Sequence, residues 1–376
     1  MAIDHIREPW KGTMTPRERF NRQMHFQSVD RSFNMEFGYW EENYEEWKMF
    51  TENGIRNEGQ ANRFFSFDPI HGIHGTIFMC PAFESKQIGT SEDGKMILLQ
   101  NSEGLIAEQP VDGHSTIPHY LKSQIVTPDD WKKVKAERFD VNHPGRKVDI
   151  DAWKARHKPD EGRDYPLGVD CGSMIGRIRD MLTFEGLCYA VFDYPEMVED
   201  MVETCCVLVE NFLDQVLPHF KFDYASGWED ICFKNGPIVP PSFFRDVLKP
   251  RYRRIRDRLD RYGIDVWYTD CDGDVRPILK HLMDGGINCL FPYEVNSCAH
   301  PGELLDQFPG LRIMGGVDKI EMAKGPAAID AYLESLIPYV ARGGYIPFCD
   351  HRCPPNVKEE DYLYYLDKKQ ELFGMK

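Results

Sequence analysis

Over residues 165–376, short β-rich runs alternate with longer helical segments, and this alternation constrains the fold more than any other feature of the sequence. Two parallel strands need a crossover connection, usually a helix, so repeated strand and helix units predict a parallel sheet with helices outside it. We therefore predict an α/β fold, a (β/α)8 TIM barrel. An open doubly wound sheet is the alternative, although no glycine-rich phosphate loop follows the first of these strands. The predicted strands are 166–171, 224–228, 265–269, 289–293, 311–314 and 345–348.

The chain is predicted to form one domain over 1–376, because barrels of this type often exceed the usual length of a single domain. Its N-terminal part, 1–65, is expected to hold helices and a first strand at 33–39. Residues 66–125 carry glycine, proline and short alternating segments, which predict an insertion of irregular strands and loops near the barrel mouth. Regular repeats then fill 165–376.

Helical periodicity is clearest over residues 196–217. Apolar side chains recur there at spacings of three and four positions, which is typical of a helix that buries one face. We expect that face to consist of Met201, Cys205, Leu208, Phe212 and Val216.

The chain is acidic, with 61 Asp and Glu against 45 Lys and Arg and a formal net charge of −16. A nucleic acid or an anionic membrane would repel such a surface, so we expect a small-molecule substrate and neither of those partners. The 11 cysteines lie mostly in apolar runs, and the start of the sequence lacks an apolar signal region. Free thiols and a cytoplasmic location are therefore expected. The sequence leaves the oligomeric state open, with a homodimer among the candidates.

Acidic residues follow five consecutive predicted strands. In such barrels the active site lies at the C-terminal ends of the strands, so these side chains are expected to surround one cavity. A carboxylate at a strand end often only caps the next helix, and a histidine there can be an ordinary loop residue. Several inward-pointing acids would nevertheless repel one another unless a cation or a basic group lay among them. The residues concerned are Glu229, Asp230, Asp270, Asp272, Glu294, Asp318, Asp350 and His351.

A zinc site is one interpretation of this pattern. Asp270 and Asp272 are two residues apart, so in extended backbone their side chains point the same way. Together with His351 they would supply two oxygens and one nitrogen and leave a coordination position free, which is typical of catalytic zinc. Glu229 is a candidate for a further ligand or for a proton donor.

Several motifs resemble those of the uroporphyrinogen decarboxylase superfamily, which also contains corrinoid-dependent methyltransferases. The resemblance implies a (β/α)8 barrel with its cleft at the C-terminal face. In the decarboxylases proper an arginine-rich segment grips a substrate with many carboxylates, but the matching stretch here, 29–40, has one arginine, Arg31, followed by an acid. The motifs are Met14-Thr15-Pro16-Arg17-Glu18, Gly172-Ser173-Met174-Ile175-Gly176-Arg177, Trp228-Glu229-Asp230, Gly315-Gly316-Val317-Asp318-Lys319 and Asp350-His351.

The methyltransferase branch holds zinc with a His-x-Cys pair and a later Cys. The resemblance places Asp270 and Asp272 at the pair and His351 at the last ligand. Carboxylate and histidine make a harder zinc site than thiolates do, which would suit the oxygen or nitrogen of a methylated substrate. The implied activity is methyl transfer from a small methoxylated or methylated compound to a corrinoid protein, with Glu229, Asp272 and His351 as catalytic residues. Expected substrate contacts are Tyr39, Arg177, Asn235, Tyr293 and Glu294.

Two other functions remain open. One is a metal-free decarboxylase of a small carboxylate or a tetrapyrrole, in which Lys319 and the acids would handle protonation. The other is a barrel without catalysis that keeps a ligand pocket.

Overall fold

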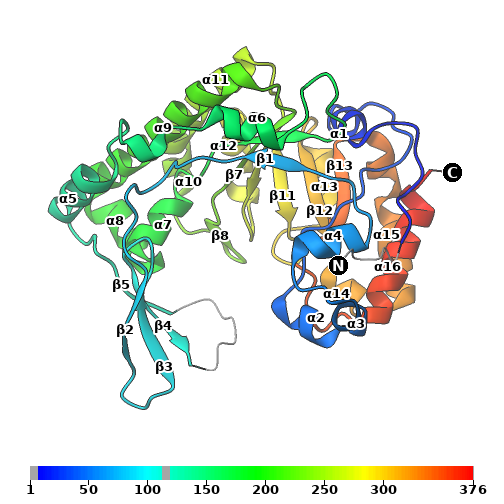
Figure 1. Ribbon diagram of the computed structural model, residues 1–376, viewed down its shortest axis with the longest axis horizontal. Coiled ribbons are helices and arrows are strands. Elements are labelled where there is room, and N and C mark those ends of the chain that lie inside the picture. Colours follow the sequence, from blue (N-terminus) through cyan, green and yellow to red (C-terminus); the bar gives the residue numbers. More distant parts are fainter. Residues whose placement is uncertain (1–6, 112–118, 376) are drawn as a thin grey trace.

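The computed structural model describes residues 7–111 and 119–375, and its centre is a parallel sheet of seven strands (Figure 1). The spatial order is β1-β6-β7-β10-β11-β12-β13. All six strands predicted over 165–376 are present, and every pair in the sheet is parallel. The strands are β1 (His71–Ile73), β6 (Leu167–Asp170), β7 (Tyr224–Trp228), β10 (Trp267–Asp270), β11 (Cys289–Tyr293), β12 (Arg312–Val317) and β13 (Tyr345–Cys349).

The eighth position of a closed barrel is not filled by a paired strand. The segment 33–39, predicted as a strand, runs along β13 but forms only the isolated bridge between Tyr39 and Cys353. Hydrogen bonds to side chains replace the backbone pairing of a strand here. The N–H of Phe33 donates to Gln23, and the N–H of Asn34 donates to Asp68. The Glu36 carboxylate accepts from the N–H of Cys349. The barrel-like architecture is thus confirmed, whereas closure by eight paired strands is not.

Helices cover the outside of the sheet, as predicted (Figure 1). The predicted face of α9 is buried throughout. The segment predicted to be helical between 41 and 65 is broken into three short helices. Among the described residues, none of the helices is both long and apolar enough to cross a membrane. The helices are α1 (Pro16–Met24), α2 (Glu41–Glu46), α3 (Lys48–Asn53), α4 (Glu58–Phe64), α5 (Pro128–Arg138), α6 (Ile150–Arg156), α7 (Gly176–Leu182), α8 (Phe184–Asp193), α9 (Pro195–Val216), α10 (Pro241–Phe243), α11 (Lys249–Arg261), α12 (Arg276–Gly285), α13 (Pro301–Gln307), α14 (Lys319–Met322), α15 (Pro326–Arg342) and α16 (Glu359–Phe373).

The insertion predicted over 66–125 is more regular than expected. It begins with β1, which belongs to the central sheet, and continues as a separate antiparallel sheet in the order β2-β3-β4-β5 that projects from the body (Figure 1). Strand pairing within this sheet explains the short alternating runs seen in the sequence. These strands are β2 (Lys86–Thr90), β3 (Met96–Gln100), β4 (Ile106–Pro110) and β5 (His119–Lys122), and a small hairpin joins β8 (Cys232–Phe233) to β9 (Gly236–Pro237).

Side chains that point inward from the strands form a core of their own. Phe20 and Met24 of α1 belong to this inner cluster, so the first helix fills the end of the sheet opposite the mouth. Tyr268 and Phe291 pack on the cluster from the mouth side.

One buried ion pair fastens the unpaired segment 33–39 to the C-terminal helix. Lys369 Nζ lies 2.7 Å from Glu36 Oε1, and both side chains are at most 1% exposed. Tyr365 donates to the same oxygen at 2.8 Å, and Lys369 also donates to the carbonyl of Met35 at 3.0 Å. The carboxylate therefore substitutes for strand pairing by binding α16 and β13 at once.

We predict that Lys369→Met lowers the free energy of unfolding by about 3–5 kcal/mol, because it leaves the Glu36 carboxylate buried without its cation. Urea unfolding followed by circular dichroism measures this change. Lys48→Met, at an exposed position of α3, is the matched control and should leave the stability unchanged. Equal midpoints for the two variants would contradict the role given to the pair.

Candidate active site at the barrel mouth

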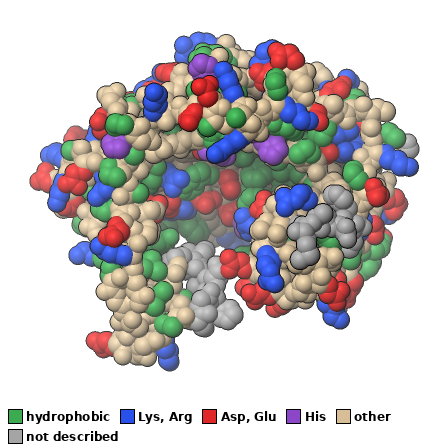
Figure 2. Space-filling model, viewed as in Figure 1, with side chains coloured by type: hydrophobic (Ala, Val, Ile, Leu, Met, Phe, Trp, Pro, Cys, Tyr) green, Lys and Arg blue, Asp and Glu red, His purple; other side chains and the backbone are tan. Residues whose placement is uncertain are grey.

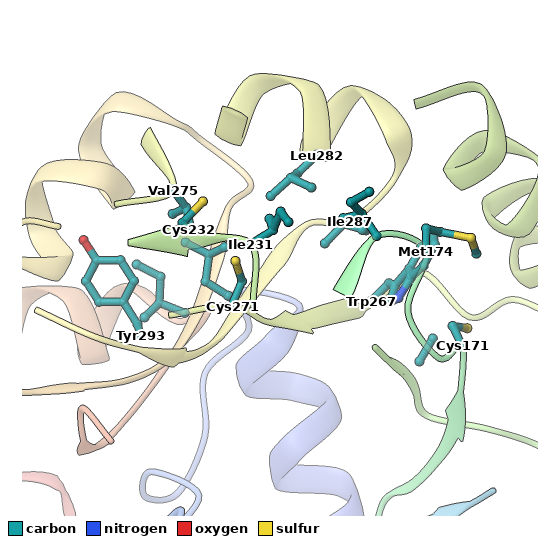
Figure 3. Close-up of a cluster of buried hydrophobic side chains, with 14 of the residues drawn as sticks. Cys171, Met174, Ile231, Cys232, Trp267, Cys271, Val275, Leu282, Ile287 and Tyr293 are labelled. Carbon is teal, nitrogen blue, oxygen red and sulfur yellow. The ribbon is translucent and has the colours of Figure 1, made fainter. Parts of the chain in front are cut away.

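The end of β10 positions two carboxylates on the same side of the chain. Cys271 is buried and packs with Ile231, Cys232 and other apolar side chains behind the strand (Figure 3). Since side chains alternate in extended backbone, Asp270 and Asp272 project to the opposite side. The apolar residue between them thus fixes both acids toward the mouth.

Asp230, which follows β7, joins these two acids. Its N–H and that of Glu229 donate to the carbonyl of Asp270, at 3.4 and 2.7 Å. The N–H of Asp272 in turn donates to the Asp230 carboxylate. Three carboxylates from adjacent strand ends are therefore held together by backbone hydrogen bonds.

Crowding and burial change the acidity of this group. Burial, followed by the charges of Asp230 and Asp272, raises the pKa of Asp270 to about 8. Burial and the charge of Asp272 raise the pKa of Asp230 to about 6, although Arg179 acts in the other direction. Asp270 consequently carries its proton at neutral pH and is able to act as an acid.

His351 approaches the cluster from the end of β13. Its Nε2 lies 3.4 Å from Oδ2 of Asp272, and the other oxygen of Asp272 is buried with no hydrogen-bond partner among the described residues. No group of three or more His, Cys, Asp or Glu side chains within 7–111 and 119–375 has the arrangement of a metal site. The predicted ligands therefore do not fit zinc as they are arranged, and the zinc site stays a prediction without geometric support.

Glu229 has a structural task instead of the catalytic or metal-binding one expected from the sequence. Its carboxylate accepts hydrogen bonds from Ser173 Oγ, from three N–H groups at the start of α7 and from Tyr252 Oη at 2.6 Å. A carboxylate at a helix N-terminus is stabilised by the orphan N–H groups and by the helix dipole. Because Glu229 is 3% exposed and bonded on both oxygens, its carboxylate is separated from the acid cluster, although Asp230 is the next residue in the sequence.

Two tyrosines expected to contact substrate are engaged inside the protein. Tyr39 is buried among aromatic rings, and its hydroxyl lies 2.6 Å from that of Tyr362. Tyr293 is buried as well and donates to the carbonyl of Ala299 at 2.9 Å. Neither hydroxyl is free to bind a ligand, so these two expectations are corrected.

Glu294 and Asn235 lie at the edge of the mouth. Glu294 accepts from Lys319 Nζ at 2.8 Å, and Lys319 lies 3.5 Å from Asp350. Lys319 is therefore paired with two acids, whereas a decarboxylase would need it as a free proton donor. Asn235 is exposed in the turn between β8 and β9, which leaves it free to meet a bound molecule.

Two cavities lie near the mouth, and Figure 2 shows a hollow whose floor carries acidic side chains. A cavity of about 590 Å³ is lined by Asp230 and Asp272. A larger one of about 920 Å³ is lined by aromatic rings, including Tyr268 and Phe291. Asp270 is the register partner of Phe291 on the neighbouring strand, so the protonated acid lies beside the aromatic wall.

The aromatic wall formed by Phe37, Tyr268 and Phe291 is not among the site residues predicted from the sequence. Phe291 packs edge-on against Phe37 at 5.2 Å and tilts against Tyr268 at 4.6 Å, and Phe37 packs edge-on against His351 at 5.4 Å. Alternation within the predicted strands, which places Tyr268 and Asp270 on one side, was the signal that could have found it.

Arg177, an expected substrate contact, is also at the mouth. It lies in the first turn of α7 and is sandwiched between Phe78 and Trp228. Trp228 is the register partner of Asp270, so the two side chains emerge on the same side of the sheet. The structure thus brings together Asp270, Asp272 and His351, places Arg177 against Trp228, and leaves Glu229, Tyr39 and Tyr293 outside.

Comparison with known proteins supports the fold. The chain is similar to a solved methyltransferase from Methanosarcina mazei, with a TM-score of 0.55 and 14% identity over 96% of this chain and 100% of that one. No family model and no curated protein matches the sequence significantly. Membership of the uroporphyrinogen decarboxylase superfamily therefore stays a prediction.

We predict that Asp270→Asn stabilises the protein relative to wild type as the pH rises from about 4 to about 8. An acid with a raised pKa in the folded state holds a proton that the unfolded chain has already lost, so wild-type stability falls over this range. Urea unfolding at several pH values measures the difference.

Asp246→Asn is the control. Arg245 lowers the pKa of that exposed aspartate, so this variant should become less stable relative to wild type as the pH rises. A difference between Asp270→Asn and wild type that does not grow with pH would show that Asp270 has an ordinary pKa.

Proposed function

We propose that this protein is a methyltransferase that removes a methyl group from a small methoxylated or methylated aromatic compound and passes it to a corrinoid protein. The observation that carries the proposal is the position of Asp270, an acid protonated at neutral pH, beside an aromatic wall. The similarity in fold to a methyltransferase agrees with it.

The chemistry needs a proton at the leaving oxygen. When a methyl ether transfers its methyl group, the bond between methyl carbon and oxygen breaks and its electron pair remains on oxygen. The proton of Asp270 moves to that oxygen, a neutral alcohol or phenol leaves, and solvent reprotonates Asp270. General acid catalysis of this kind contributes about 10²–10⁴-fold in rate.

Other residues of the mouth position the substrate. Phe37, Tyr268 and Phe291 offer ring faces and edges for a substrate ring. His351 and the unpaired oxygen of Asp272 offer hydrogen-bonding groups next to the reacting oxygen. Each of these contributions uses this chain's own side chains and involves no metal.

The methyl acceptor comes from outside the chain in this proposal. A reduced corrinoid supplies a strong nucleophile for methyl groups when it is bound to its own protein. Figure 2 shows a hollow whose floor carries acidic side chains, and in this proposal the partner approaches the site there.

We expect wild-type protein to transfer the methyl group of 2-methoxyphenol to chemically reduced cobalamin, with equal amounts of catechol and methylated cobalamin formed. Asp270→Asn should lower kcat/KM by about 10²–10⁴-fold, and the wild-type rate should fall above about pH 8 as Asp270 loses its proton. Absorbance of the cobalamin and chromatography of the phenol measure both products.

The surface variant Asp246→Asn should keep the wild-type rate. Full activity in Asp270→Asn would reject the general acid. Release of carbon dioxide from a methoxybenzoate without methyl transfer would favour a decarboxylase, and binding without any turnover would favour a non-catalytic barrel. The zinc prediction is tested separately: zinc present in a 1:1 ratio and lost in His351→Ala would restore it.

A further inference from the structure

Arg177 is held across the mouth by two aromatic rings. Its guanidinium carbon lies 4.7 Å from the ring centre of Phe78 and 4.8 Å from that of Trp228. Phe78 follows β1 and Trp228 ends β7, and β6 lies between these two strands in the sheet. The guanidinium is therefore placed over the C-terminal end of β6, on the side of the sheet where Asp270 emerges.

Within the described part of the chain no acid forms an ion pair with this cation, although its charge acts on Asp180, three residues later. Its guanidinium makes neither an ion pair nor a hydrogen bond there, although its backbone N–H donates to Ser173. Arg179, two residues later on α7, is fully used: it pairs with Asp180 at 3.0 Å and donates to the carbonyl of Asp230. The carboxylate that ends β6, Asp170, is itself occupied by His74 at 3.2 Å and by the N–H of Gly172 at 2.7 Å.

A guanidinium held in this way is prepared for a planar anion. Two rings lie against the guanidinium, so the N–H donors that do not face the rings remain for a ligand. A carboxylate accepts two parallel hydrogen bonds from such an edge, and the stacked rings have already fixed the side chain.

The surrounding charges limit which anion fits. The carboxylates of Asp230 and Asp272 follow the neighbouring strands, so a ligand with many negative charges would be repelled. A single carboxylate satisfies Arg177 and keeps the remainder of the ligand neutral among the acids.

We propose that Arg177 binds the carboxylate of the substrate, which makes the substrate of the proposed function an aromatic monocarboxylate. The inference rests on the proposed function for the identity of the reacting group, but recognition of the carboxylate is a separate property of the site. Phe78 and Trp228 act as positioning residues that keep the guanidinium in place.

Isothermal titration calorimetry with 4-methoxybenzoate and 4-methoxybenzamide tests the proposal, because the two compounds have the same shape and differ in charge. Wild-type protein should bind the acid at least about tenfold more tightly than the amide. Arg177→Gln should weaken binding of the acid by about 10–100-fold and leave the amide unchanged, in line with a hydrogen-bonded pair of charges. Arg177→Lys should recover part of the lost affinity.

Arg245→Gln, which changes an exposed arginine paired with Asp246, is the matched control and should bind as wild type does. Equal affinity of wild type for acid and amide, failure of wild type to bind the acid, or unchanged binding in folded Arg177→Gln would overturn the proposal. These titrations contain no methyl acceptor, so they succeed or fail independently of methyl transfer. If 2-methoxyphenol is demethylated while the acid has no advantage, the role of Arg177 fails and the proposed function stands.

Discussion

The parallel pairing of β10 with β7 on one side and β11 on the other is the constraint on which the site depends. It fixes Asp270 between Trp228 and Phe291, its register partners, and so places an acid between a stacked cation and an aromatic wall. Burial of Cys271 behind the same strand prevents the chain from turning these acids away. The proton on Asp270 follows from this arrangement, since three carboxylates forced together cannot all remain ionised at low cost.

The periodicity of the sequence was sufficient for the regular half of the fold. The six strands after residue 165 and the buried face of α9 follow from apolar spacing, because strands paired in a ladder and a regular helix bury side chains at fixed intervals. The segment 33–39 has the same β-rich composition and yet is not a paired strand. Its N–H groups donate to Gln23 and Asp68, and such long-range side-chain contacts leave no periodic mark in a sequence.

The site was predictable to the level of strand ends but not of individual side chains. Asp270, Asp272 and His351 do converge, as strand order in a barrel requires. Glu229 follows a strand in the same manner, yet its carboxylate turns back to bind the start of α7. Glu229 points away from the mouth because N–H groups at the start of a helix more than 50 residues earlier bind its carboxylate. Spacing along the sequence does not reveal this contact.

The account depends most directly on the protonation state of Asp270, and carbon-13 NMR of protein labelled at aspartate carboxyl groups measures it. The resonance that is absent from Asp270→Asn identifies the residue. A titration of that resonance with its midpoint near pH 8 is the expected result, because burial and two neighbouring carboxylates oppose the charge. A midpoint near pH 4, the value of an ordinary aspartate, would show that Asp270 is ionised under neutral conditions and would contradict its role as the acid.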